Sequence, residues 1–295
     1  TIVSVMLRRF LLAALLTGMP LALFAGEITL VGSDLLKPAL EPVLAQTSRG
    51  SAGAVRLRLE GSHAGLQELR AGKADLAVVA FAPNEPLPEA EFRLVPLAYQ
   101  VDVLVVPGNN PIRQVSYAQL GGLFGEKEAV NHRQWGALGA KGVWEDKTVT
   151  LSTVESPDSL ALDLFRFTVL RVPQLKTTMG IHPNLDELVR RVRVDDTTIA
   201  LFPCLPTDIA GLHVLLVARD DKDVAFGPTP ENIHTGDYPI RLPFYIVFKP
   251  ERAAELVGVV NTLLDEPVAV ELTKLGYVPV PANFRREAQR TLGAK

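Results

Sequence analysis

The sequence is poor in the residues that build disulfides and metal sites. Its 295 residues include one cysteine, Cys204, so neither an internal disulfide nor a pair of thiolate ligands can form. Pro203 and Pro206 flank this cysteine in an apolar stretch, which predicts a buried, unreactive thiol. The histidines lack the His-x-x-x-His spacing of a helical zinc site; they are His63, His132, His182, His213 and His234. We therefore expect no metal and no cofactor.

Signatures of catalysis and of nucleic-acid binding are also missing from the sequence. It contains no Gly-x-Ser-x-Gly nucleophile elbow and no Gly-x-x-x-x-Gly-Lys phosphate loop. The formal net charge is −3, and basic residues form no run and do not alternate with aromatic residues. This charge pattern argues against nucleic acid as a partner. We expect a binding protein rather than an enzyme.

The longest apolar run lies near the start of the sequence. Residues 6–9 form a short basic region with Arg8 and Arg9, residues 10–24 are largely apolar, and Ala25 and Gly26 supply the small side chains of a cleavage site. This order predicts a secretory signal peptide over residues 1–25, with residues 1–5 upstream of its first methionine and cleavage near Ala25. An uncleaved membrane anchor is the alternative, although the run is short for a membrane span.

The stretch from residue 55 to residue 81 carries the clearest local signal. Apolar and basic residues alternate over 55–59 as in a half-buried strand, and 75–81 is apolar as in a buried strand. Between them, the turn Gly61-Ser62 opens a helical pattern. The free N–H groups in the first turn of a helix form a ready anion site. A turn that only caps the helix is the alternative.

A strand, a hydroxyl-bearing turn and a helix occur three times, which predicts an α/β fold with mostly parallel sheets flanked by helices. Ligands bind such sheets at the carboxyl ends of the strands, so the three turns could converge on one site. The candidate ligand-binding residues in these turns are Ser33, Asp34, Ser62, His63, Ser156 and Ser159. Other helices are expected over residues 35–45, 116–124 (with Ser116 as cap), 160–170, 185–192, 251–264 and 267–275, and residues 276–281 close the chain.

Several segments in order along the chain are similar to one family. The first segment is similar to a Gly-Ser-Gly-x-Gly helix start that is followed by Gly-x-x-Asp and a strand. It comprises Gly61-Ser62-His63-Ala64-Gly65-Leu66 and, further on, Asp75-Leu76-Ala77. The other matching segments are 97–106 with its Asn-Pro turn, 116–124 with Trp135, Gly236-Asp237-Tyr238-Pro239 and Gly276-Tyr277-Val278-Pro279. Together they resemble the phosphate-binding protein family of bacterial ABC importers.

The resemblance implies a two-lobed periplasmic-binding-protein fold of type II. Residues 27–101 and 239–295 would form lobe 1, and residues 102–238 would form lobe 2. The implied function is hinge closure of the lobes around phosphate or another small polar ligand, without chemistry. It also implies a periplasmic location, an ABC permease in the inner membrane as partner, and a monomer.

The match to the family's ligand residues is partial. Ser33, Ser62 and Ser159 fall where the family has hydroxyls, while His63 replaces a usual glycine. The family's arginine has no counterpart at 153–155, and loss of such a charge-assisted pair typically removes about 1.5–3 kcal/mol of binding. The alternative function is therefore a binding-fold protein that has lost phosphate transport and acts as a sensor or a protein-interaction module.

Overall fold

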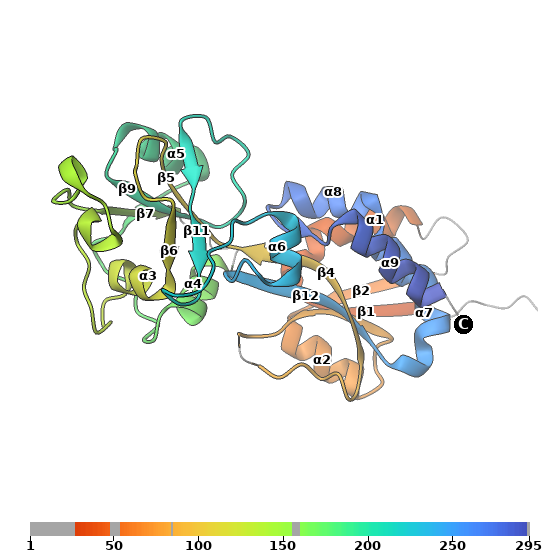
Figure 1. The fold of residues 1–295 in the computed structure, drawn as a ribbon. Coiled ribbons are helices and arrows are strands. Elements are labelled where there is room, and N and C mark those ends of the chain that lie inside the picture. Colours follow the sequence, from red (N-terminus) through yellow and green to blue (C-terminus); the bar gives the residue numbers. More distant parts are fainter. Residues whose placement is uncertain (1–26, 48–53, 84, 155–159, 294–295) are drawn as a thin grey trace, which may run out of the picture.

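The computed structural model describes residues 27–47, 54–83, 85–154 and 160–293. The predicted signal peptide and the predicted ligand residues Ser156 and Ser159 lie outside these ranges. Within them the chain forms two lobes that lie side by side, with β4 and β12 running toward the junction (Figure 1). No helix in the described ranges is both long and apolar enough to cross a membrane.

The first lobe is built on a six-stranded sheet with the order β13-β4-β12-β3-β1-β2. Its strands are β1 (Ile28–Gly32), β2 (Val55–Leu59), β3 (Leu76–Ala80), β4 (Arg93–Val101), β12 (Arg241–Phe248) and β13 (Val278–Pro279). Strand β1 runs parallel to β2 and β3, whereas β12 is antiparallel to both β3 and β4. The helices of this lobe are η1 (Asp34–Leu36), α1 (Lys37–Thr47), α2 (Ser62–Arg70), η4 (Pro250–Arg252), α7 (Ala253–Leu264), α8 (Glu266–Lys274) and α9 (Ala282–Gly293).

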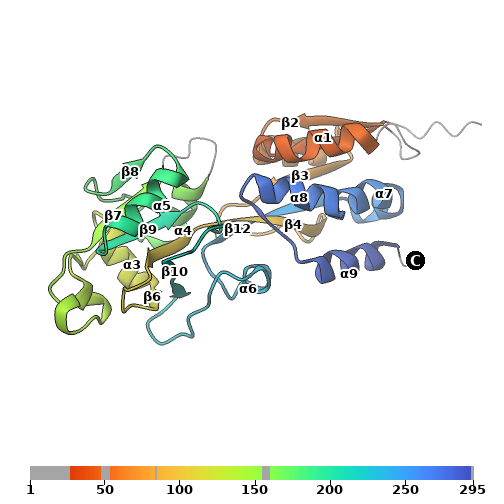
Figure 2. The same cartoon turned by 90° about the horizontal axis from the view of Figure 1, so that it is seen from above.

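Helices cover both faces of this sheet. Leu30 and Val78 point to one face and pack with α1, α7 and α8, whereas Val31 and Val79 point to the other face and pack with α2. Neighbouring residues of a strand face opposite ways, so two covered faces require a continuous apolar run, as in β3. Figures 1 and 2 show α2 on the side opposite α8, and α7 and α8 between α1 and α9.

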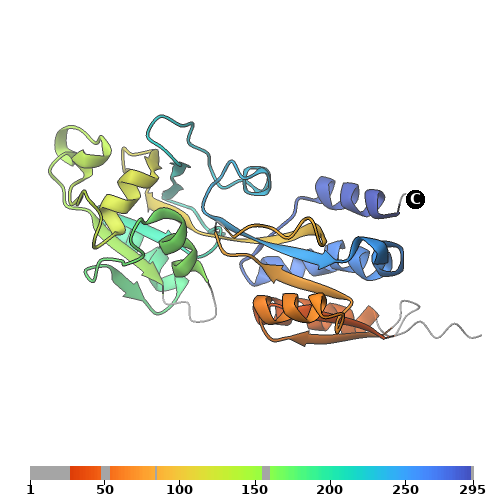
Figure 3. The same ribbon diagram turned by 90° about the horizontal axis from the view of Figure 1, so that it is seen from below.

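The second lobe is built on a five-stranded sheet with the order β10-β5-β9-β7-β8 and a two-stranded sheet, β11-β6. The strands are β5 (Val103–Pro107), β6 (Gln114–Ser116), β7 (Thr150–Val154), β8 (Gly180–His182), β9 (Thr198–Phe202), β10 (Leu212–Val214) and β11 (Leu216–Ala218). The helices are α3 (Tyr117–Phe124), η2 (Trp135–Leu138), η3 (Gly142–Trp144), α4 (Ala161–Val169), α5 (Leu185–Val194) and α6 (Pro230–Thr235). Figure 3 shows this lobe at the end of the molecule remote from α9.

Two chain segments connect the lobes, and they are bonded to each other. A single residue, Asp102, separates β4 from β5, and Tyr238–Ile240 leads from α6 into β12. The Asp102 N–H donates to the Ile240 carbonyl oxygen at 3.2 Å, and the Tyr238 hydroxyl donates to the Asp102 carbonyl oxygen at 2.6 Å. The junction is therefore a narrow two-strand connection of the kind that permits hinge motion.

The sheets are mixed rather than mostly parallel. In the described ranges, parallel pairing joins β1, β2 and β3 in the first lobe, and it joins β7, β8 and β9 as well as β6 and β11 in the second. Antiparallel pairing arises because β12 returns from the second lobe and enters between β3 and β4, and because β5 runs antiparallel to β9. The fold class, α/β with helices flanking each sheet, is confirmed.

Two helices were not predicted from the sequence. Helix α9 follows residues 276–281, where the chain was expected to close, and α6 precedes the Gly-Asp-Tyr-Pro segment. The predicted helix after Ser116 is confirmed as α3, and Ser116 caps it through a reciprocal capping box with Gln119.

Candidate functional site

The carboxyl ends of β1, β2 and β3 meet at one edge of the first-lobe sheet. The Gly61 N–H donates to the Gly32 carbonyl oxygen at 2.8 Å, and the Ser33 N–H donates to the Val78 carbonyl oxygen at 2.8 Å. These two bonds bring the turn after β1 next to the turn after β2. Ser33 and Ser62, both predicted as ligand residues, therefore lie at the same edge, which is where ligands bind in open α/β sheets.

The start of α2 presents unused backbone donors at this edge. Gly61 precedes the helix without a side chain to cap it, and the first bond inside the helix runs from the Gly65 N–H to the Gly61 carbonyl oxygen at 3.0 Å. The N–H groups of Ser62, His63 and Ala64 come before that bond, so they are the orphan donors of the first turn. A helix start of this kind favours an anion.

The two serine hydroxyls are arranged as donors. The Ser62 oxygen accepts a hydrogen bond from the Ala80 N–H at 3.0 Å, so its own hydrogen remains available to a ligand. Ser33 is 3% exposed, and its side chain makes no capping bond to the short helix η1 that follows it. A buried hydroxyl at the end of a strand, next to a helix start, suits an acceptor ligand such as an oxyanion.

The other two described candidates, Asp34 and His63, are exposed. Burial, with a smaller effect of the nearby Asp34 carboxylate, raises the pKa of the Tyr277 hydroxyl to about 12. The His63 Nε2 lies 2.8 Å from the Gln67 Nε2 along α2. His63 therefore interacts along its own helix, while Asp34 lies within electrostatic reach of Tyr277.

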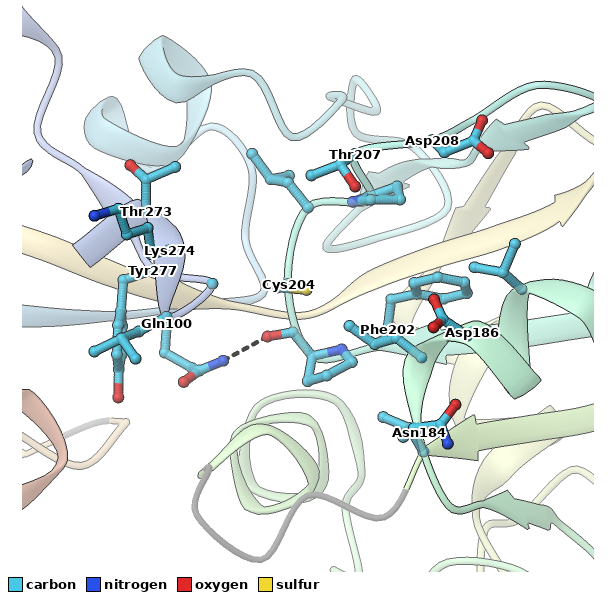
Figure 4. A pocket seen from close by; sticks show the side chains of 18 of the residues that line it. Gln100, Asn184, Asp186, Phe202, Cys204, Thr207, Asp208, Thr273, Lys274 and Tyr277 are labelled. Atoms are coloured by element: carbon cyan, nitrogen blue, oxygen red, sulfur yellow. Dashed lines mark hydrogen bonds between the residues drawn. The ribbon is translucent and has the colours of Figure 1, made fainter. Parts of the chain in front are cut away.

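A cleft of about 810 Å³ lies between the two lobes. Figure 4 shows Gln100, Thr273, Lys274 and Tyr277 on one side and residues of the second lobe, such as Asn184 at the start of α5, on the other. The Gln100 Nε2 donates to the Pro203 carbonyl oxygen at 2.6 Å and so bridges the sides.

None of Ser33, Asp34, Ser62 or His63 lines this cleft directly. The cleft approaches the sheet edge that carries these residues through Tyr277, which is within electrostatic reach of Asp34.

Sequence reasoning missed most of the cleft. Tyr277 stands in the Gly-Tyr-Val-Pro motif, which was a signal for the family but not for a site residue. Cys204 was expected to be buried; it is half-buried and lines the cleft, where burial raises the pKa of its thiol. A raised thiol pKa agrees with the predicted lack of reactivity.

The basic side chains that line the cleft already have acidic partners. Arg193 lies 2.7 Å from Asp208, Arg190 lies 2.8 Å from Glu187, and Lys274 lies 2.7 Å from Glu271. Each of these pairs is solvent-exposed, so it contributes little to stability. An anion in the cleft would therefore rely on N–H and hydroxyl donors or would compete with these carboxylates.

Arg241, near the chain's return to the first lobe, is also engaged. Its Nη1 donates to the carbonyl oxygens of Ile233 at 2.7 Å and His234 at 2.9 Å, at the end of α6. Within the described ranges, no group of three or more His, Cys, Asp or Glu side chains could hold a metal ion.

The sequence matches no family model, and no curated protein matches it. Solved structures do match. A possible phosphate-binding protein from Planctomyces limnophilus is 18% identical with a TM-score of 0.68, over 91% of this chain and 98% of that one. PstS from Borrelia burgdorferi is 15% identical with a TM-score of 0.70, over 86% and 98%. An ABC-type phosphate transport receptor from Vibrio cholerae is 19% identical with a TM-score of 0.59, over 85% and 99%. The chain thus has the type II periplasmic-binding-protein fold of these phosphate-binding proteins.

Proposed function

We propose that the protein is a periplasmic solute receptor that binds a small oxyanion, with phosphate as the first candidate, by closure of its two lobes. The observation that carries the proposal is the edge where Ser33, Ser62 and the uncapped start of α2 meet. Hydroxyl and N–H donors without a fixed positive charge suit a dehydrated anion held by several short hydrogen bonds. The fold shared with phosphate-binding proteins supports the choice of ligand.

The binding residues on the second lobe would come from the turn between β7 and α4, which contains Ser156 and Ser159. The two-strand connection at Asp102 and Ile240 would absorb the rotation of the lobes on closure. Delivery of the ligand to an ABC permease would follow from the same fold relationship.

The direct test is isothermal titration of the protein with phosphate, with sulfate in a parallel titration. We expect heat and a one-to-one stoichiometry for phosphate. Asp34 lies next to Ser33 and could accept the proton of hydrogen phosphate, which sulfate lacks at neutral pH, so we expect weaker binding of sulfate. Absence of heat at millimolar phosphate would refute phosphate as the ligand.

Replacement of Ser62 by alanine should weaken phosphate binding by about tenfold to a hundredfold, because a hydrogen bond to a charged group contributes roughly 1.5–3 kcal/mol. The matched control is Ser116→Ala, which removes a helix cap in the second lobe. It should cost about 1 kcal/mol of stability and leave affinity unchanged. Equal affinities for Ser62→Ala and the unaltered protein would exclude Ser62 from the site.

A second function, in a protein that has lost phosphate transport, is favoured by the charge pairing in the cleft. The three basic side chains that line it each contact a carboxylate, and Arg241 contacts helix α6. Such a protein would show no heat with phosphate or sulfate yet keep its fold. It would then act as a sensor or a protein-interaction module.

A further inference from the structure

Asp102 is an unusual residue for the position it occupies. It is the one residue between β4 of the first lobe and β5 of the second, and it is 0% exposed. Among the described residues, neither oxygen of its carboxyl group makes a hydrogen bond of ordinary geometry, and the Phe165 N–H only lies close enough to act on the group. Buried polar groups are almost always paired, so an unpaired carboxyl group at the junction of two lobes requires an explanation.

The backbone of Asp102, in contrast, is fully paired. Its N–H and its carbonyl oxygen bond to Ile240 and to the hydroxyl of Tyr238, both in the other connecting segment. Tyr238 is itself 0% exposed. The residue is therefore fixed in place at the point where the two connections touch, and any rotation of the lobes must act on it.

The groups of the described ranges that act on the carboxyl group carry no positive charge. They are the Tyr238 hydroxyl, the Cys204 thiol and the backbone N–H of Phe165 on α4. Burial raises the pKa of Asp102 well above its usual range, against a smaller opposing effect of the Phe165 N–H. Because an ionised carboxylate without a partner is very costly to bury, the carboxyl group is neutral in this arrangement of the lobes.

The wall between Asp102 and the cleft is shared by the lobes. Cys204 belongs to the second lobe and lines the cleft, and a Cβ added at Gly276 of the first lobe would lie 3.1 Å from the Cβ of Cys204. Rotation that separates Gly276 from Cys204 would open this wall. Water could then reach the carboxyl group and stabilise its charged form.

We propose that Asp102 couples a proton to the angle between the lobes. The neutral carboxyl group favours the arrangement seen here, and loss of the proton shifts the molecule toward an arrangement in which the junction is open to water. The coupling is reciprocal: a ligand that favours one arrangement also changes the affinity of Asp102 for its proton. This inference does not depend on the identity of the ligand.

Small-angle X-ray scattering of the ligand-free protein between about pH 4 and pH 9 tests the proposal. We expect the radius of gyration of the unaltered protein to shift as the pH rises. Asp102→Asn and Asp102→Leu, which cannot ionise, should keep the low-pH value throughout. Glu41→Gln, which removes an exposed acid of α1 in the first lobe and outside the candidate site, should shift like the unaltered protein.

Circular dichroism at each pH identifies the range over which each variant is folded, and the comparison is made within that range. The proposal is overturned if Asp102→Asn or Asp102→Leu shifts as the unaltered protein does. It is equally overturned if the unaltered protein keeps one radius of gyration over the whole range in which it is folded.

Discussion

Replacement of Gly32 by alanine is expected to lower the free energy of unfolding by about 4 kcal/mol or more. Gly32 ends β1 with a φ of +128°, which L side chains rarely adopt, and strain of this kind costs roughly 1–3 kcal/mol. In addition, a Cβ at this position would lie 2.0 Å from the Val78 carbonyl oxygen. That oxygen accepts the Ser33 N–H, so it cannot move without loss of a bond that shapes the candidate site.

Urea denaturation measures the effect, and Gly61 provides the matched control. Gly61 has the same φ of +128°, yet a Cβ there would meet nothing within 4 Å. Gly61→Ala should therefore show the strain alone, about 1–3 kcal/mol. If Gly32→Ala were no more destabilising than Gly61→Ala, the close approach of β1 to β3 would not be what requires glycine.

The same crowding explains how the site is assembled. A Cβ at Gly65 would lie 2.5 Å from the Cα of Gly32, so α2 packs directly on the end of β1. Small residues at both positions let the start of α2 approach Ser33. The Gly-Ser turn was predicted from the sequence, but the lack of room for a side chain arises from contacts between segments, of Gly32 with Val78 and of Gly65 with Gly32.

Sequence patterns predicted those elements that are determined by residues close together in the chain. The apolar run at β3 was predicted because burial on both faces leaves no polar position. Ser116 was predicted as a cap because a hydroxyl before a helix satisfies a free N–H within three residues, and it accepts the Gln119 N–H. These features need no information about distant segments.

Features with distant causes could not be predicted. Helix α9 has only Arg285 and Leu292 buried, and its apolar stripe is short, with Phe284 and Ala288 partly buried against the core. Arg285 donates to the Leu264 carbonyl oxygen at 2.8 Å and lies 2.6 Å from Glu266, across the junction of α7 and α8. The pairing of strand β12 also depends on distant segments. Its apolar run does not reveal whether it pairs parallel or antiparallel, or that it lies between β3 and β4.

The candidate site divides in the same way. Ser33 and Ser62 were found because each follows a strand and opens a helix. Tyr277, Asn184 and Thr207 line the cleft from segments far apart in the chain, and no local pattern marks them. Asp102 lies inside the segment 97–106 that was matched to the family, and no local pattern marks it, because only its burial at the junction makes its charge significant.

Removal of the Asp102 carboxyl group is expected to stabilise the protein at neutral pH. The pKa of Asp102 is raised in the folded state, so the folded state holds a proton that the unfolded chain releases above about pH 4. The free energy of unfolding is therefore unaffected below the pKa that the Asp102 carboxyl group has in the unfolded chain. Above that pKa it falls by about 1.4 kcal/mol per pH unit. Asp102→Asn lacks this loss, so its advantage over the unaltered protein should grow with pH until the carboxyl group of the folded protein also ionises.

Urea denaturation of Asp102→Asn and the unaltered protein at a series of pH values tests this expectation. The two stabilities should converge near pH 4 and separate as the pH rises, whereas Glu41→Gln should follow the unaltered protein. If the free energies of unfolding of Asp102→Asn and the unaltered protein differed by the same amount at every pH, the buried carboxyl group would not be neutral.

If the folded protein can open its junction and release the Asp102 proton, the fall in the free energy of unfolding must stop at the pH of that release. Above this pH the carboxyl group is charged in both the folded and the unfolded protein. That pH should coincide with the midpoint of the shift in radius of gyration. Agreement between a stability measurement and a shape measurement would tie the proton of Asp102 to the movement of the lobes.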